Sequence, residues 1–215
     1  MTKISNDEEK EVSRAEALRV LHQRILNCRL CEEHGYIPKA QPLTSGRARD
    51  RIMVIGQAPG HRSVANGRSF SGPGGRILQK WLEQAGFPPG YLHSHTYLSS
   101  LTHCDPGRNP RGDGDRRPSP QEVALCRPFL EAELQLLQPK VVLLVGSMAI
   151  ETFFGKVIER FGADRIAWGS NFPNSVGTLK EILTAAQKAF SFAKASDQDW
   201  IFGKTAQVLY PVLKD

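Results

Sequence analysis

Hydrophobic positions along the chain follow two spacings, one typical of helices and the other of buried strands. Apolar residues recur every three or four positions over 8–27, which predicts an amphipathic helix there. Similar patterns predict helices over 75–85, 120–137, 147–154, 176–194 and 197–210. Short apolar runs predict strands over 51–56, 97–102, 140–146 and 165–169. Because strands and helices alternate, we expect an α/β fold, a three-layer αβα arrangement with a short, mainly parallel central sheet.

The composition is that of a globular protein. The chain has 215 residues, of which 40% are hydrophobic and 23% charged, so it can bury a core and is not disordered throughout. No apolar run approaches the ~18–20 residues of a membrane span. The N-terminus is polar and acidic, unlike a secretory signal. We therefore expect a cytoplasmic protein, a monomer, with no membrane partner.

The positive charge of the chain is concentrated in its middle. The formal net charge is +6, and residues 39–127 carry 13 basic and 6 acidic side chains, a net +7. Eleven of those 13 basic residues are arginine, whose planar group of donors suits phosphate. The charge alone is equally compatible with a solvated basic face or with an anionic partner.

The four cysteines suggest a metal centre. Cys28 and Cys31 are spaced to reach one metal, whereas Cys104 and Cys126 are separated by a long loop. Four cysteines are the number that an iron–sulfur cluster or a structural zinc requires. Disulfides would conflict with a reducing cytosol, and ordinary core cysteines remain the alternative.

Two glycine-containing segments follow the predicted strand 51–56. The loop Gly56-Gln-Ala-Pro-Gly60 is neither a Walker loop nor a GxGxxG motif, but its glycines allow backbone amides to approach a ligand closely. The second segment, 67–75, opens a predicted helix and so predicts an anion site. Phe70 lies within it and either stacks on a planar base or anchors its own loop.

Taken in order, five motifs resemble those of a known enzyme family. They are Cys28-x-x-Cys31, Val54-Ile-Gly-Gln-Ala-Pro-Gly60, Gly67-Arg-Ser-Phe-Ser-Gly72-x-x-Gly75, Cys104 with Arg117-Pro-Ser-Pro-x-Glu122-x-x-x-Cys126, and Pro139-Lys-Val-Val-Leu-Leu-Val-Gly146. Over residues 17–155 this set resembles the iron–sulfur uracil-DNA glycosylases, family 4 and its close relatives. No single motif is decisive, but the ordered set is specific.

The resemblance implies a function in DNA base-excision repair. It implies hydrolysis of the N-glycosidic bond of uracil flipped out of DNA, with single-stranded or uracil-containing DNA as the partner. Cys28, Cys31, Cys104 and Cys126 would ligate a structural [4Fe–4S] cluster. The loop of Gly56, Gln57, Ala58, Pro59 and Gly60 would lie against the uracil and its sugar, and Phe70 would stack on the base.

Two positions depart from the family pattern within this region. Gln57 stands where the family often has Glu, and an amide can orient the attacking water but cannot take its proton. Ser100 stands where the family commonly has an Asn that reads the edge of uracil, and its hydroxyl has a shorter reach.

The largest departure is a missing motif. The family has a late His-Pro-Ser whose His donates to the uracil oxygen, but no His follows His103 here. Loss of one such donor costs about 2.7–4 kcal/mol of transition-state stabilisation. We expect Asn171 or Asn174 to replace it in part. The alternative is a catalytically impaired iron–sulfur relative that binds the base in DNA without excising it.

The tail, 156–215, has a different resemblance. Its segment from Phe161 to Pro173 and its end, Gly203 to Tyr210, resemble the C-terminus of amidohydrolase-superfamily enzymes, which suggests a gene fusion. We expect residues 1–155 to form the glycosylase-like domain and the tail to complete it, with Ile166-Ala-Trp168 as an added parallel strand.

Overall fold

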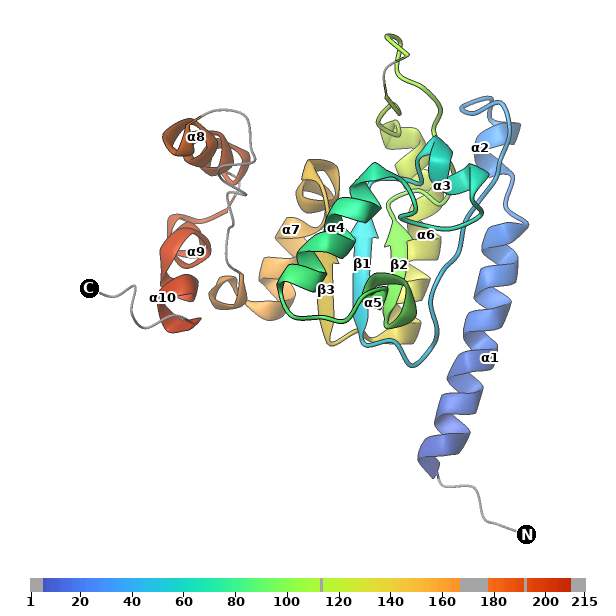
Figure 1. Ribbon diagram of the computed structural model, residues 1–215, viewed down its shortest axis with the longest axis horizontal. Coiled ribbons are helices and arrows are strands. Elements are labelled where there is room, and N and C mark those ends of the chain that lie inside the picture. Colours follow the sequence, from blue (N-terminus) through green and yellow to red (C-terminus); the bar gives the residue numbers. More distant parts are fainter. Residues whose placement is uncertain (1–5, 113, 167–177, 192, 210–215) are drawn as a thin grey trace. The chain divides into compact units, whose positions relative to one another are not determined.

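The computed structural model describes residues 6–112, 114–166, 178–191 and 193–209 (Figure 1). The chain divides into two compact units, 1–149 and 150–215. Among the helices that these ranges contain, none is long and apolar enough to cross a membrane.

A parallel sheet of three strands forms the centre of the first unit. Its strands are β1 (Ile52–Gly56), β2 (Thr96–Ser100) and β3 (Val141–Leu144), in the order β2-β1-β3. In the register, Val54 of β1 pairs with Leu98 on one side and with Leu143 on the other. The strands fall where the apolar runs predicted them, and the predicted α/β fold class is confirmed.

Helices cover both faces of this sheet. On one face α4 (Pro73–Gln84) and α5 (Tyr91–Ser94) pack Leu78 and Leu92 against Val54 and Leu98. Side chains alternate along a strand, so Tyr97 and Ser99 point to the other face, where both donate to Glu133 of α6 (Pro120–Leu137). Figure 1 shows α4 in front of the sheet and α6 behind it. The predicted layers are therefore present.

The remaining elements of this unit surround that core. The long N-terminal helix α1 (Asn6–Leu26) buries Leu18, Leu21 and Ile25, and packs against α6. Two short helices follow, α2 (Leu30–Glu33) and α3 (His61–Ala65).

Helix α7 (Ser147–Phe161) begins as predicted but does not end at Gly155. That predicted end was wrong. A glycine inside a helix costs only about 1 kcal/mol relative to alanine, which packing can offset.

The second unit has a small helical core of its own. Ala163, Phe190 and Ile201 are its buried centre, with Ile158 and Trp200 packed against them. Its further elements are η1, a 3₁₀ turn (Ala163–Arg165), α8 (Leu179–Ala189), α9 (Ala195–Asp199), η2, a π-helical turn (Trp200–Lys204), and α10 (Thr205–Leu209). The predicted helix over 197–210 is thus a succession of three short elements.

The predicted strand 165–169 is not borne out at its first residue, because Arg165 closes the turn η1. Residues 167–169 of that strand lie outside the described residues, as do Asn171 and Asn174.

Candidate functional site

A cavity of about 450 Å³ opens where the three strands end. Gly56 ends β1, Ser100 ends β2 and Val145 follows β3, and all three residues line it. The carboxyl edge of a parallel sheet is where α/β proteins bind ligands, and the volume suits a small molecule or a single base. The loop after β1, the helix α3, the start of α4 and the segment 106–116 supply the other walls.

The loop Gly56–Gly60 is held by the chain that follows β2. Leu101 N donates to Gly56 O at 3.0 Å and Thr102 N to Gln57 O at 3.4 Å, which continues the pairing of the two strands past their ends. All five loop residues line the cavity, together with Phe70 and Ser100. The structure therefore gathers in one place the substrate-binding residues predicted from the β1 loop, the glycine-rich segment and β2.

Phe70 both anchors its loop and faces the cavity. Its ring is half-buried and packs against the core cluster that contains Leu78. A β-carbon at Gly56 would lie 2.8 Å from Phe70 Cζ, and one at Gly75 would overlap the Phe70 carbonyl oxygen. Phe70 itself has a φ of 54°, a conformation unusual for a large side chain. Glycines from two separate motifs thus make room for one strained aromatic residue.

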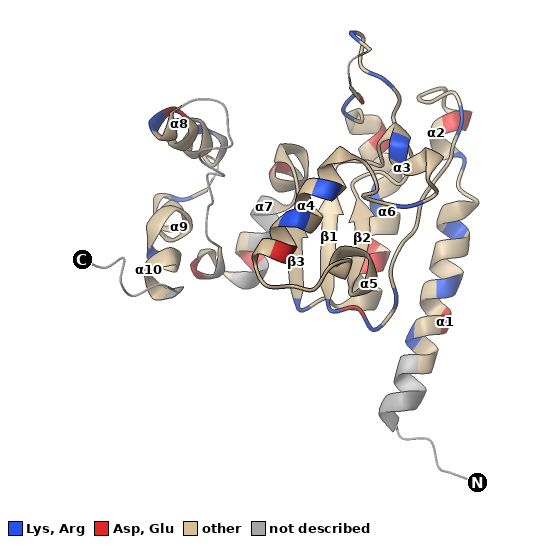
Figure 2. Ribbon diagram, in the orientation of Figure 1, with Lys and Arg blue, Asp and Glu red and all other residues tan. Residues whose placement is uncertain are grey.

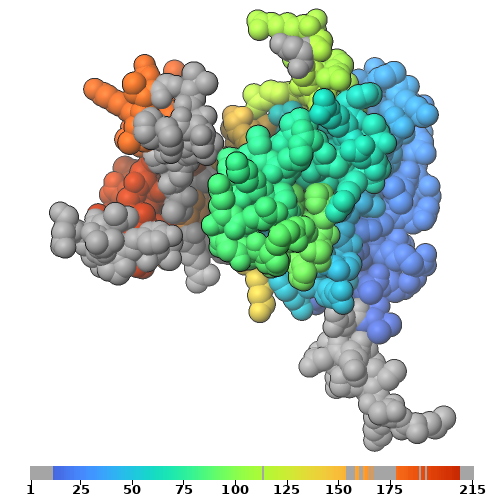
Figure 3. All heavy atoms as spheres, in the orientation of Figure 1, coloured from blue at the N-terminus to red at the C-terminus, as the bar shows by residue number. Residues whose placement is uncertain are grey.

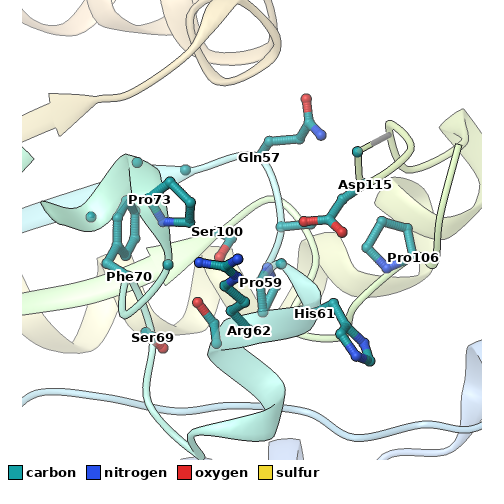
Figure 4. Close-up of a pocket in the computed structure, with 18 of the residues that line it drawn as sticks. Gln57, Pro59, His61, Arg62, Ser69, Phe70, Pro73, Ser100, Pro106 and Asp115 are labelled. Atoms are coloured by element: carbon teal, nitrogen blue, oxygen red, sulfur yellow. The ribbon is translucent and has the colours of Figure 1, made fainter. Parts of the chain in front are cut away.

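Gln57 and Ser100 also line the cavity, and in the view of Figure 4 they lie between Phe70 on one side and Asp115 on the other. The Gln57 side-chain amide donates to the Arg116 carbonyl at 3.5 Å, and Ser100 is buried at the end of β2. An amide and a hydroxyl can orient a water or a base edge, but neither accepts a proton at neutral pH.

Sequence reasoning missed several polar residues of this cavity, namely Arg62, Arg108, Asp115 and Arg116. Three of them belong to the polar loop after Cys104, which gave no helix or strand signal of its own. Figure 4 shows Asp115 and Phe70 on opposite sides of the cavity. Hydrogen bonds to residues distant in the sequence hold this loop at the site, and local sequence patterns do not predict such bonds.

Arg116 is fixed from two directions. Its two terminal nitrogens bind the Glu122 carboxylate at 2.7 and 2.8 Å, and one of them donates to Tyr36 O at 3.0 Å. Burial alone would raise the pKa of Glu122, but the hydrogen bonds from Arg116 and Ser119 lower it below its ordinary value. The ion pair ties the wall of the cavity to the first turn of α6.

The four cysteines line a second, small and mainly apolar cavity. Cys28 follows α1, Cys31 lies in α2, Cys104 follows β2 and Cys126 lies in α6, and none forms a disulfide. Burial raises the pKa of Cys31 to about 11 and that of Cys104 to about 12, and the neighbouring sulfurs add to the effect. The structure thus places the four cysteines around one cavity.

Cys126 is held by a buried polar chain. His103 N donates to Cys126 Sγ at 3.3 Å, and the ring Nδ1 lies 3.2 Å from the same sulfur. On the other side of the ring, Nε2 lies 3.2 Å from Glu133 Oε1. Burial alone would lower the pKa of His103, but the Glu133 carboxylate raises it to about 10. Glu133 also accepts hydrogen bonds from Tyr97 and Ser99, so β2, α6 and the cysteine cavity form one network.

The donor set fits an iron–sulfur cluster in its chemistry. Four free thiols share one cavity, and the backbone N–H of His103 is directed at one sulfur, as in sites that tune thiolate ligands. Within the described part of the chain, however, no three Cys, His, Asp or Glu side chains are arranged to hold a single metal ion. The cysteines surround a space and do not converge on a point.

The fold and the main cavity together define a three-layer α/β protein with a cavity at the carboxyl edge of a parallel sheet. The family model of the Uracil DNA glycosylase superfamily matches residues 43–209. The chain belongs to this superfamily.

Among its curated relatives are two type-4 uracil-DNA glycosylases. That of Sulfurisphaera tokodaii is 24% identical over 148 residues, covering 69% of this chain and 63% of the relative. That of Pyrobaculum aerophilum is 29% identical over 148 residues, covering 67% and 70%. A type-5 uracil-DNA glycosylase of Thermus thermophilus is 31% identical over 134 residues, covering 57% and 58%. The chain thus spans 58% to 70% of the length of these relatives.

The amidohydrolase resemblance of the tail gains no support from these comparisons. The superfamily model extends through residue 209 and so covers most of the segment for which a gene fusion was expected.

Proposed function

We propose that the protein is a DNA repair glycosylase that hydrolyses the N-glycosidic bond of uracil flipped out of DNA. One observation carries the proposal: the loop Gly56–Gly60, Phe70 and Ser100 line a single base-sized cavity at the carboxyl edge of the sheet. The names of the type-4 and type-5 relatives support the same substrate. A glycosidic bond inside a duplex is inaccessible, so the enzyme acts on single-stranded DNA or on an extruded nucleotide.

Some residues of the cavity bind the base, and others bind the DNA backbone. Phe70 stacks on the uracil ring, while Ser100 and the amides of the β1 loop contact the base edge and the sugar. Gln57 orients the attacking water. Arg62 and Arg108 are exposed at the cavity, where they contact the DNA phosphates. Bond cleavage produces a sugar cation and a uracil anion, so donors directed at the uracil oxygen lower the barrier.

Asn171 and Asn174 are proposed as such donors, in place of the missing histidine. The family match over 43–209 supports a role for this segment in the domain. Asn171→Ala and Asn174→Ala should each depress uracil excision, measured as the single-turnover rate. If neither substitution changes the rate, the replacement idea is wrong.

Cys28, Cys31, Cys104 and Cys126 are proposed to hold a [4Fe–4S] cluster. When bound, the cluster supplies a rigid cross-link between α1, α2, α6 and the loop after β2. The raised pKa values of Cys31 and Cys104 mean that both thiols lose a proton on ligation. The proposal predicts iron, sulfide and visible absorption in the purified protein.

A non-excising DNA-binding protein is the second candidate, and the amide at Gln57 together with the lack of a late histidine favours it. Incubation with a uracil-containing single strand, followed by alkali, separates the two. Strand cleavage after alkali supports the glycosylase. Binding without cleavage, by protein with its full iron content, supports the second candidate and contradicts the first.

The domain organisation is part of the proposal. Residues 1–155 form the glycosylase domain and 156–215 complete it, in a protein that acts as a monomer. The superfamily match, which runs across residue 155, supports a single domain.

A further inference from the structure

We propose that Asp115 is the catalytic residue that accepts a proton from the attacking water. This inference rests on the proposed glycosylase function and deepens it. The motif resemblance assigns no role to Asp115, and the residue at the motif position that often carries Glu is Gln57, which cannot accept that proton. The motif position that could supply a base therefore holds a residue that cannot act as one.

A hairpin brings Asp115 into the cavity. Asn109 N donates to Gly114 O at 2.9 Å and Arg116 N to Gly107 O at 2.8 Å, and Arg108 and Asp115 form an antiparallel bridge between the two arms. The segment 107–116, with Asp113 outside the described residues, thus folds back on itself. Figure 3 shows that this segment stands out from the surface. Its residues Arg108, Gly114, Asp115 and Arg116 line the cavity.

Gly60 makes the room for Asp115. A β-carbon at Gly60 would overlap Asp115 Oδ2, so this oxygen lies directly against the backbone of the β1 loop. The other oxygen, Oδ1, lies 3.7 Å from Arg108 Nη1, and the side chain is 34% exposed. The β1 loop therefore requires glycine at position 60, because any side chain there would displace the Asp115 carboxylate.

The position of Asp115 suits a water that attacks the sugar. Phe70 lies on one side of the cavity and Asp115 on the other (Figure 4). The glycosidic bond of a stacked base lies in the plane of that base, so in this proposal the sugar extends along the cavity to the place where Asp115 Oδ2 and the β1 loop meet. Water between the sugar and Asp115 is then placed for in-line attack on C1′.

Among the described lining residues, Asp115 is the single carboxylate. Asp105, on the same loop, is engaged elsewhere: its Oδ1 accepts from Gly107 N at 2.8 Å and its Oδ2 lies 3.6 Å from His61 Nδ1. Asp105 does not line the cavity. It therefore serves as a matched control within the same loop.

The proposed step balances without any co-reactant other than water. The C1′–N1 bond breaks, and its electron pair leaves with uracil as an anion. The water oxygen bonds to C1′, and one of its protons passes to Asp115. Asp115 then returns this proton to the uracil anion or to solvent. The products are uracil and DNA with an abasic site.

The first test compares Asp115→Asn with Asp105→Asn. We expect Asp115→Asn to lower the single-turnover excision rate 10²- to 10⁴-fold, as general-base removal typically does, and to change the affinity for uracil-containing DNA less than threefold. Asp105→Asn should stay within threefold of the wild type in both. A rate loss below tenfold in Asp115→Asn, or an affinity loss equal to its rate loss, would overturn the proposal.

A second test uses the smaller variant Asp115→Ala with added formate. The formate carboxylate enters the space that the side chain vacates, so it should accelerate excision by Asp115→Ala at least tenfold and leave the wild type unchanged. No acceleration would contradict the proton-acceptor role. Iron content and circular dichroism establish that each variant is folded. If the wild type itself excises no uracil, the proposed function fails, which is a different outcome from an active wild type with an active Asp115→Asn.

Discussion

At the scale of single residues, the site depends on two close contacts with glycine. Gly56 admits the edge of the Phe70 ring, and Gly60 admits the Asp115 carboxylate. Glycines in a loop indicate that another group comes close to the backbone, but they do not identify that group. Here the approaching groups are an aromatic edge and a carboxylate, and Phe70 and Asp115 lie on opposite sides of one cavity (Figure 4).

Phe70→Leu distinguishes stacking from anchoring. Leucine keeps an apolar side chain against the core cluster but has no planar face, so thermal stability should change little. Affinity for uracil-containing DNA should fall by about 1–3 kcal/mol, the typical value of base–aromatic stacking. Equilibrium binding and thermal unfolding measure the two effects. Unchanged affinity with a lowered melting temperature would show that the ring only anchors its loop.

Glu133 lies at the centre of the buried network, because Tyr97, Ser99 and His103 all contact its carboxylate. It faces His103 and accepts from Tyr97 and Ser99 at a position that is 1% exposed. Glu133→Gln should lower the free energy of unfolding by about 3–5 kcal/mol, because it removes the buried negative charge that faces His103. It should also quicken the loss of visible absorption in the presence of a chelator, since His103 contacts Cys126. A loss of less than 1 kcal/mol in chemical denaturation would contradict this account.

At the scale of elements, the sequence predicted the helices and strands that local residue patterns determine. Strand β1 and helix α4 followed from apolar periodicity and flanking glycine or proline. The end of α7 was mispredicted because glycine is a weak stop. The hairpin 107–116 was not predictable, because its pairing joins polar residues that show no alternation. The loop residues Arg108 and Asp115 were therefore missed as members of the site.

Helix α6 offers a pH-dependent test of how its first turn is held. Glu122 forms a capping box with Ser119 and an ion pair with Arg116. Because its folded pKa is lowered, its contribution is present above the ordinary carboxyl pKa and is lost as the pH falls through the folded value. Glu122→Gln should cost about 1.5–3 kcal/mol near pH 7, typical of hydrogen bonds to charged groups. The cost should shrink in acid.

Ser119→Ala is the matched control for that prediction. This substitution removes one cap hydrogen bond and leaves the Glu122 carboxylate in place. It should therefore lower the free energy of unfolding by about 1 kcal/mol, and most of this loss should persist in acid, where Glu122 is protonated. Urea denaturation of both variants between pH 3 and pH 7, a range of about four units around the carboxyl pKa, measures the difference. Equal pH dependence in the two variants would refute the assignment.

At the scale of the whole molecule, the charge distribution separates the regions of the chain. Residues 39–127 carry a net +7, whereas 1–38 and 128–215 carry −1 and 0. The cavity with Arg62, Arg108 and Arg116 lies within the basic stretch, and Figure 2 shows basic residues on α3 and on the loop above it. Three arginines of the basic stretch thus line the proposed site, which favours a phosphate backbone as their partner.

Salt dependence of DNA binding tests this placement. Each phosphate contact contributes about −0.7 to the slope of log K against log salt for single strands, so Arg62→Ala with Arg108→Ala should reduce its magnitude by about 1.4. Lys188→Ala, an exposed change on α8, removes a charge from the neutral C-terminal region and should leave the slope as it is. Fluorescence titration of a uracil-free single strand from 50 to 200 mM salt, a range of roughly fourfold, measures all three proteins. Equal slopes in the double variant and the wild type would place the DNA backbone elsewhere, because a cation that contacts phosphate must release counterions.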